Sequence, residues 1–157
     1  MSEYALGLDN VGHFYALKYT DKEKELLKAI QDCSIFPEYI IPYIKKASSN
    51  FVEKFETEHT IKGITVTSSG FYAPQGRALR LPTHTSDLHE KLEIFKHNSH
   101  RFVNFEMESS ALFALGTALG HYCATICLGI ANRPAKEFSS DYSSHMKDLI
   151  QHVLKRL

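Results

Sequence analysis

The sequence predicts a three-layer α/β domain, in which helices cover both faces of a sheet. Apolar, strand-like runs alternate along the chain with segments whose apolar residues recur at helical spacing. Three of the runs, beginning near Ile61, Phe102 and Tyr122, end in loops rich in polar residues. With 157 residues and neither an internal repeat nor a flexible linker, the chain is expected to form a single domain over residues 1–157.

The first part of the chain is expected to hold one strand and then a helix. Residues 4–9 form an apolar run, and residues 13–19 are expected to continue in an extended form. Thr20 should begin a helix, because Glu23 stands three positions later and completes a capping box. This helix is expected to end near Cys33.

Prolines govern the next stretch. Pro37 and Pro42 keep residues 35–47 extended or turned, because proline fixes its own backbone and restricts the residue before it. A helix is then expected to begin after Ser48 or Ser49.

The rest of the chain carries the clearest patterns. Residues 61–70 are β-branched and nearly uncharged, which is typical of a buried strand, and residues 86–98 have an amphipathic helical pattern. Residues 102–120 pass from a short apolar strand into a helix. Residues 122–132 are predicted to form a second long apolar strand, and residues 143–157 a final amphipathic helix.

Composition excludes several classes of partner. The chain has 18 basic and 18 acidic residues, so its formal net charge is zero and neither nucleic acid nor a membrane is expected as a partner. No apolar run approaches the about 20 residues of a membrane span, and no secretion signal is present, so a cytoplasmic location is expected. The three cysteines form neither an even framework nor a metal-binding pattern, which predicts reduced thiols and no metal.

Two carboxylates stand between the strand that begins at Phe102 and the helix that follows it. If Glu106, Met107 and Glu108 continue the strand, both carboxylates face one side; if the helix has already begun, they diverge. An ionised carboxylate can accept two hydroxyl hydrogens, which suits the cis-diol of a sugar. Acidic residues are also common in the first helical turn, where they complement the macrodipole. The spacing alone leaves both interpretations open.

The loop at residues 71–77 combines an aromatic ring, an amide and a guanidinium. The amide of Gln75 offers a donor beside an acceptor, the complement of the imide edge of uracil, and Arg77 offers a donor for the remaining carbonyl. Phe71 is suited to stack on or flank the ring. The same loop also suits a solvated turn, since Pro74, Gln75 and Gly76 are typical turn residues.

Three motifs occur in a definite order: Phe-Tyr-Ala-Pro-Gln-Gly-Arg closing the stretch 63–77, Phe-Glu-Met-Glu-Ser-Ser-Ala at 105–111, and Ile-Ala-Asn-Arg at 130–133. In order and separation they resemble the carboxyl-terminal part of a uridine phosphorylase, in the nucleoside phosphorylase superfamily. The resemblance implies an α/β/α fold with a mixed central sheet that lacks the family's amino-terminal part. It also implies phosphorolysis of uridine to uracil and ribose 1-phosphate, with phosphate as co-substrate and no cofactor.

The resemblance further implies a role for each motif residue. Gln75 and Arg77 would hold the pyrimidine, Met107 would pack on the sugar, and Glu108 would bind the ribose hydroxyls. Arg77 and Glu108 are the implied catalytic residues. The other implied substrate-binding residues are Phe71 in the base pocket, Glu106 in the sugar motif, Ile130 and Ala131 at the border of the base, and Arg133 as support for the base-binding loop.

Asn132 bears on the choice of base. Purine-cleaving relatives carry at this position an Asp that helps to protonate the departing base. Asn cannot act as a general acid, and uracil needs none because its anion is delocalised. The residue therefore favours a pyrimidine.

The family's amino-terminal half, with its phosphate-gripping arginines and glycine-rich loops, has no counterpart in the sequence. No arginine precedes Arg77, and Gly7 and Gly12 do not form a phosphate loop. The isolated chain is therefore expected to be inactive without that half. A non-catalytic nucleoside-binding remnant and a nucleoside hydrolase are the alternatives. A partial sheet would expose an apolar edge, which predicts either a poorly soluble monomer or a homo-oligomer, a dimer or hexamer of dimers.

Overall fold

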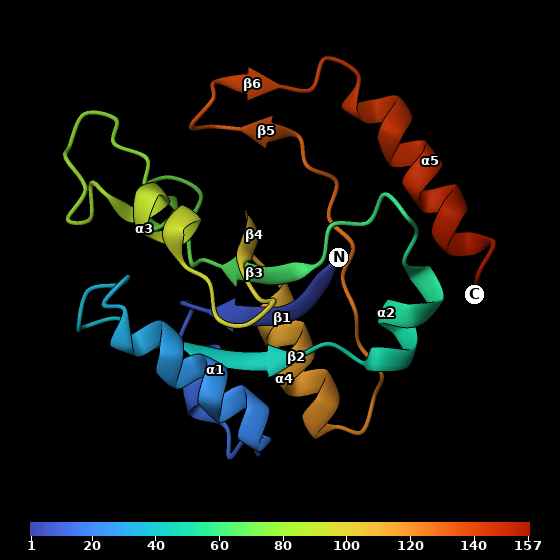
Figure 1. Ribbon diagram of the computed structural model, residues 1–157, viewed down its shortest axis with the longest axis horizontal. Helices are drawn as coiled ribbons and strands as arrows, with labels where there is room; N and C mark the ends of the chain where they lie inside the picture. Colours follow the sequence, from blue (N-terminus) through green and yellow to red (C-terminus); the bar gives the residue numbers. More distant parts are fainter.

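The computed structural model describes all residues 1–157 and contains a four-stranded mixed sheet with helices around it (Figure 1). β1 (Ser2–Gly7) is antiparallel to β2 (Tyr43–Lys46) and parallel to β3 (Gly63–Thr67), and β4 (Phe102–Glu106) is parallel to β3. The strand order is β2-β1-β3-β4, so β4 forms one edge of the sheet. The implied mixed α/β sheet is confirmed.

Helices cover both faces of the sheet, as predicted. α1 (Asp21–Asp32) and α3 (Leu88–Ile94) contribute to a hydrophobic cluster on one face. α2 (Ser49–Phe55) and α4 (Ser109–Ala118) contribute to a second cluster on the other. α5 (Tyr142–Leu154) lies at one flank of the molecule and has no buried residue (Figure 1). The remaining elements are the 3₁₀ helices η1 (Val11–Phe14) and η2 (Ala73–Gln75) and a hairpin of β5 (Ala131–Asn132) and β6 (Glu137–Phe138).

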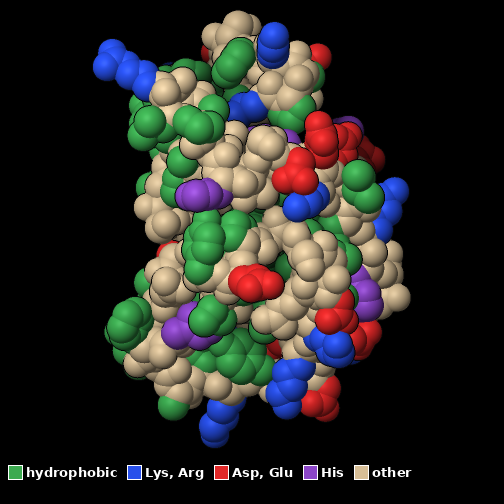
Figure 2. Space-filling view, turned by 90° about the vertical axis from the view of Figure 1, so that its left-hand side faces the viewer, with side chains coloured by type: hydrophobic (Ala, Val, Ile, Leu, Met, Phe, Trp, Pro, Cys, Tyr) green, Lys and Arg blue, Asp and Glu red, His purple; other side chains and the backbone are tan.

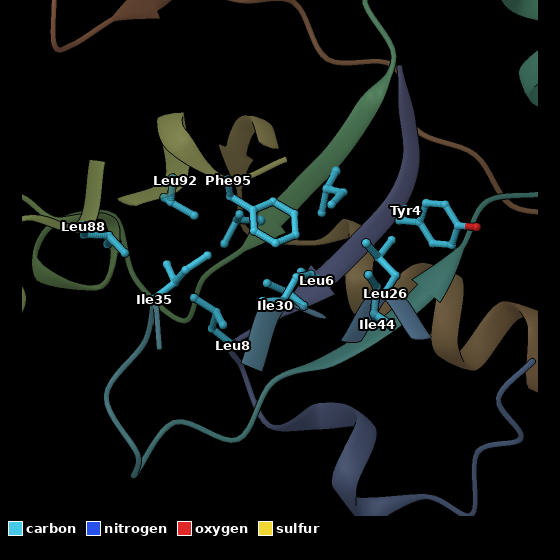
Figure 3. Close-up of a cluster of buried hydrophobic side chains, with 12 residues drawn as sticks. Tyr4, Leu6, Leu8, Leu26, Ile30, Ile35, Ile44, Leu88, Leu92 and Phe95 are labelled. Atoms are coloured by element: carbon cyan, nitrogen blue, oxygen red, sulfur yellow. The ribbon is translucent and has the colours of Figure 1, made fainter. Parts of the chain in front are cut away.

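Side chains of β1 alternate between the two faces of the sheet, and they contribute to a hydrophobic cluster on each face. Tyr4 and Leu6 point into the larger cluster, whereas Ala5 between them belongs to the smaller one. The larger cluster, shown in Figure 3, packs the sheet against α1 and α3 through side chains such as Leu26 and Leu92. Because successive residues of one strand serve different clusters, a one-residue shift in register would exchange the two cores.

The predicted capping box at the start of α1 is confirmed. Glu23 N–H donates to Thr20 Oγ1 at 3.3 Å, and Thr20 N–H donates to the Glu23 carboxylate at 2.7 Å. The structure adds a contact that the local pattern does not show. Glu23 is 2% exposed and pairs with the buried Lys45 of β2, with 2.9 Å between Nζ and Oε1. Its carboxylate thus joins the start of α1 to the edge strand.

Gly7 and Gly12 make room for a buried ring. A Cβ at Gly7 would lie 2.3 Å from Tyr43 Cε1, and one at Gly12 would lie 2.6 Å from Tyr43 Cδ2. Tyr43 is fully buried, and burial chiefly raises the pKa of its hydroxyl. These glycines therefore allow the backbone to pack closely against the Tyr43 ring.

The extended segment expected at residues 13–19 is wrong over its first part. The chain turns instead into η1, after Asn10 adopts a left-handed backbone with φ of 64°. Asp9 Oδ1 accepts a hydrogen bond from Val11 N–H at 3.1 Å, which stabilises this turn. The hydrogen bond to the Asp9 side chain therefore favours a turn at a place where the apolar pattern predicts an extended chain.

The long strand predicted at residues 122–132 is also wrong, since only Ala131 and Asn132 lie in a strand, and that strand belongs to the hairpin. Both edges of β1 are already taken by β2 and β3, so this segment cannot join the sheet there. It runs across the molecule instead, as the orange chain between α2 and β5 in Figure 1. The predicted elements at 61–70, 86–98, 102–120 and 143–157 each contain a strand or helix of the expected type.

None of the helices is both long and apolar enough to cross a membrane. No group of three or more His, Cys, Asp or Glu side chains is placed to hold a metal ion. Burial raises the pKa of the thiols of Cys123 and Cys127, and all three cysteines are free.

Candidate functional site

Three chain segments meet around one pocket of about 480 Å³, a volume within the range of small-molecule sites. They are the loop after β3, the turn between β4 and α4, and the stretch at residues 127–134. β1 and β3 both point toward the molecular face seen in Figure 2, where hydrophobic side chains are interspersed with histidines and single charges. The pocket is lined by all but one of the predicted site residues, namely Phe71, Gln75, Glu106, Met107, Glu108, Ile130, Ala131 and Arg133.

Gln75 is held firmly although it lies in a loop. It is 2% exposed, its Nε2 donates to Ser68 Oγ at 3.0 Å, and its Oε1 accepts from Arg133 Nη1 at 2.9 Å. A primary amide has two donor hydrogens and two acceptor lone pairs. One hydrogen and one lone pair of Gln75 therefore stay free, and the orientation of the amide is fixed by its two neighbours.

The turn that presents Gln75 depends on glycine. Gly76 ends η2 with φ of +74°, a left-handed conformation that other residues seldom adopt. A Cβ at this position would also come within 3.0 Å of His89 Nε2. The sequence Pro-Gln-Gly thus forms a compact 3₁₀ turn, and the predicted turn is confirmed.

Two guanidinium groups lie near the ring of Phe71. Arg77 Cζ is 3.5 Å and Arg133 Cζ is 5.3 Å from the ring centroid, which places both in cation–π range. Burial, and next the nearby Arg77, lowers the pKa of Arg133. Arg77 is the one predicted residue that does not line the pocket, because its guanidinium lies over Phe71. Its Nε is buried and has no hydrogen-bond partner.

The Glu106 carboxylate accepts hydrogen bonds from backbone N–H groups. Its Oε2 accepts from the N–H of Glu108 at 2.8 Å and of Ser109 at 2.6 Å, at the start of α4, and its Oε1 accepts from the Thr67 hydroxyl. Thr67 Oγ1 in turn accepts from Ser110 N–H at 2.9 Å. The helix-stabilising interpretation of the first carboxylate is therefore the one that the geometry supports.

Glu108 differs from Glu106 in exposure. It is exposed at the pocket, and the one hydrogen bond that its carboxylate accepts within the chain comes from Met107 N–H at 3.3 Å. The two carboxylates have separated because the strand ends at Glu106 and the helix begins at Ser109. Glu108 is thus the carboxylate that is free to receive a ligand.

This difference leads to a prediction about stability. Glu106→Ala should lower the free energy of unfolding by about 1–2 kcal/mol, because it removes acceptors from the first turn of α4. Glu108→Ala should change it by no more than about 0.5 kcal/mol, as for other exposed sites. Urea denaturation of both variants checks this, and equal losses would show that Glu106 has no special role in the turn.

A buried polar chain anchors the β4–α4 turn to the start of the protein. Ser110 Oγ donates to Asp9 Oδ2 at 3.1 Å and lies 2.9 Å from the Tyr43 hydroxyl. Asp9 follows β1, so the start of α4, next to the turn that carries Glu108, is tied to the end of β1.

The pocket also contains residues that the sequence pattern did not single out, among them His89, Asn104, Cys127 and Leu128. The His89 ring lies edge-on to Phe105, with 5.9 Å between centroids. Phe105 lies in the motif at residues 105–111, and that motif is the only sequence pattern that indicated this side of the pocket. The others come from positions that only the folded chain brings together.

The sequence profile of the Phosphorylase superfamily matches residues 8–157. The chain belongs to this superfamily. A solved structure of a Trypanosoma brucei nucleoside phosphorylase, described as showing uridine phosphorylase activity, superposes on 99% of the chain with a TM-score of 0.88 and 24% identity. The chain spans 56% of that structure's length. No sequence among curated proteins matches.

These comparisons confirm the predicted family and the nucleoside phosphorylase-like fold. At 24% identity, the T. brucei structure speaks for the fold alone. In this phosphorylase-superfamily chain, the pocket lies after β3, after β4 and beside the β5–β6 hairpin.

Proposed function

We propose that the chain forms the base- and ribose-binding part of a pyrimidine nucleoside phosphorylase, which converts uridine and phosphate to uracil and ribose 1-phosphate. The observation that carries this proposal is the presence of an immobilised Gln75 amide and an exposed Glu108 carboxylate in the same pocket. The amide suits a uracil edge, and the carboxylate suits the ribose hydroxyls. No cofactor takes part in this reaction, and phosphate is the co-substrate.

The free hydrogen and lone pair of Gln75 match the donor and acceptor pattern of an imide. Uracil presents N3–H beside a carbonyl oxygen, so one amide can accept from the first and donate to the second. The amide does not need to reorient on binding, because Ser68 and Arg133 already hold it. Arg77, with its buried and unpartnered Nε, is suited to the remaining carbonyl if it shifts from Phe71.

Cleavage of the glycosidic bond places negative charge on the departing base. A donor already aimed at the base oxygens stabilises this charge, and comparable preorganised donors contribute about 3–4 kcal/mol. Arg133 lines the pocket and supplies positive charge on this side of it, whereas Arg77 lies outside the pocket over the Phe71 ring. Positive charge develops meanwhile on the ribose, where the Glu108 carboxylate binds.

The choice of pyrimidine is supported by Asn132. Its side-chain amide donates to Glu137 Oε2 at 3.2 Å across the hairpin. An amide in this position cannot protonate a purine, and uracil needs no such acid. Ala131 and Asn132 of the hairpin line the pocket.

Phosphate must be gripped by other groups. Arg133 is the one arginine or lysine that lines the pocket, and it is already bonded to Gln75. We propose that the phosphate-binding groups belong to the part of the phosphorylase fold beyond the matched 56%. The isolated chain is then expected to bind uracil and uridine but to turn over little uridine.

Calorimetry with uracil and uridine tests whether Glu108 binds the ribose and not the base. Glu108→Gln should weaken uridine binding about tenfold or more, because a charge-assisted hydrogen bond contributes about 1.5–3 kcal/mol. Uracil binding should change less than about twofold, since the base does not touch Glu108. Glu90→Gln, an equal change on the exposed side of α3, is the control. Equal losses for uracil and uridine would remove Glu108 from the ribose site.

Uridine absorbance with and without phosphate tests the reaction class. Rapid loss of absorbance by the isolated chain in the presence of phosphate would contradict the proposed need for further groups. Equal rates without phosphate would identify a nucleoside hydrolase instead. Binding without any turnover, even when the rest of the fold is supplied, would favour a non-catalytic nucleoside-binding protein.

A further inference from the structure

Asn104 is a pocket residue whose amide is anchored at one end only. It lies on β4, two residues before Glu106, and lines the same pocket as Glu108. Its Oδ1 accepts a hydrogen bond from Thr65 Oγ1 at 2.7 Å. Its Nδ2 donates no hydrogen bond within the chain and is not fully buried. The amide hydrogens are therefore available to a ligand in the pocket.

A row of hydroxyls leads to this amide. Ser109 Oγ lies 2.8 Å from Thr125 Oγ1, which donates to Ser2 Oγ at 2.8 Å. Ser2 Oγ in turn lies 2.6 Å from Thr65 Oγ1. Ser2, Thr65 and Asn104 belong to the neighbouring strands β1, β3 and β4, so the row crosses the sheet (Figure 1). Ser2, Thr65 and Ser109 are each no more than 1% exposed.

The end of the row fixes the direction of every hydrogen bond in it. An amide oxygen can only accept, so the Thr65 hydroxyl hydrogen points to Asn104 Oδ1. Each hydroxyl has one hydrogen, so Ser2 must donate to Thr65. Thr125 donates to Ser2, and Ser109 must then donate to Thr125. All four hydroxyl hydrogens thus point toward the Asn104 amide.

This arrangement orients the Asn104 amide and strengthens it as a donor. Hydrogen bonds in a chain polarise one another, which strengthens each by about 10–30%. Turning the amide over would require every hydroxyl of the row to reverse. Cys127 lies beside the amide and also lines the pocket. Burial raises the pKa of its thiol, which therefore stays protonated and is only a weak acceptor for the amide hydrogens.

A ribose hydroxyl needs a donor as well as an acceptor. It carries one hydrogen and two lone pairs, and the Glu108 carboxylate can receive only the hydrogen. Among the amides and guanidinium that line the pocket, Gln75 and Arg133 bond to each other, and Asn132 bonds across the hairpin. Asn104 is the amide whose nitrogen has no partner.

We propose that Asn104 binds the ribose of the nucleoside and donates to a hydroxyl oxygen whose hydrogen Glu108 accepts. Thr65 is a positioning residue, because it orients the amide without touching the nucleoside. The inference rests on the proposed function, since it adds a donor to the ribose site of that function. A ribose hydroxyl is then held by an acceptor and a donor, both of which come from the segment 104–108.

Calorimetry with uridine and uracil tests the role of Asn104. Asn104→Ala should weaken uridine binding about five- to tenfold, because one hydrogen bond to the ligand is lost, and uracil binding less than about twofold. Asn104→Asp keeps the size of the side chain and the acceptor for Thr65, but it has no amide hydrogens, so it should weaken uridine at least as much. Asn50→Ala, on the exposed side of α2, is the matched control. Equal losses for uridine and uracil would overturn the inference.

Thr65→Val distinguishes a positioning role from a structural one. It removes the hydrogen bond that orients the amide, so uridine should bind about two- to threefold more weakly. In a chain that already carries Asn104→Ala, the same change should have no further effect on uridine, because no amide is left to orient. Equal effects in the two backgrounds would show that Thr65 does not act through Asn104.

The outcomes separate this inference from the proposed function. Uridine binding that Glu108→Gln weakens, but neither Asn104 variant does, overturns the inference and leaves the proposed function standing. Uridine binding that depends on Asn104 but not on Gln75 leaves the ribose contact standing and overturns the proposed pyrimidine site. Absence of uridine binding by the unaltered chain overturns both.

Discussion

Gln75→Ala is expected to weaken uracil binding roughly a hundredfold. The substitution removes both hydrogen bonds of the amide to the base, each worth about 0.5–1.5 kcal/mol net. It also leaves Arg133 Nη1 without the Gln75 acceptor that it now reaches at 2.9 Å. This second loss is present with and without uracil, so it lowers the stability of the fold and not the affinity for the base.

Calorimetry with uracil measures this effect, and Gln31→Ala on the exposed side of α1 is the matched control. Because Ser68 and Arg133 hold the amide, Gln75→Glu is also informative. It keeps the size of the side chain but exchanges its donor for negative charge, so it should bind uracil as poorly as the alanine variant. Unchanged affinity in either Gln75 variant would show that the base binds elsewhere.

Glu23→Ala is expected to lower the free energy of unfolding by about 3–5 kcal/mol, since it leaves a buried ammonium without its partner. Lys45 has 5% of its side chain exposed and lies 2.9 Å from the carboxylate. Lys46 N–H also loses its acceptor at 2.9 Å. Glu23→Leu combined with Lys45→Met removes both charges, and this pair should recover most of the stability.

The same pair predicts a dependence on pH. Burial alone would raise the pKa of Glu23, but hydrogen bonds from Thr20, Lys45 and Lys46 outweigh it and lower the pKa below its ordinary 4.5. The carboxylate thus stabilises the fold fully above about pH 4.5, and this contribution is lost as the pH falls through the lower folded-state value. Urea denaturation from pH 7 to pH 3 should show a smaller acid loss in Glu23→Ala than in the unaltered chain. Parallel curves would contradict the assigned role.

Elements with a local cause could be predicted from the sequence. The Thr20 to Glu23 capping box needs only four consecutive residues, and β3 needs only its uncharged, β-branched run. Contacts between distant residues had no such signal. Glu23 meets Lys45 across 22 positions, and the strand predicted at 122–132 does not join the sheet beside β1, because β2 and β3 already flank β1.

The candidate site, too, could be predicted only in part. The motifs predicted that the Gln75 loop and Glu108 would converge, and the structure places both at one pocket. Spacing could not distinguish Glu106 from Glu108, because their roles depend on where β4 ends and α4 begins. Nor could the spacing predict that Arg77 lies outside the pocket, because the position of its guanidinium depends on its contact with the Phe71 ring.

A crystal structure of the chain with uridine bound tests the central claim most directly. We expect one nucleoside in the pocket of about 480 Å³, with its imide edge on Gln75 and its two ribose hydroxyls on Glu108. Uridine outside this pocket, or in it with the base turned away from Gln75, would show that these two residues do not form a nucleoside site.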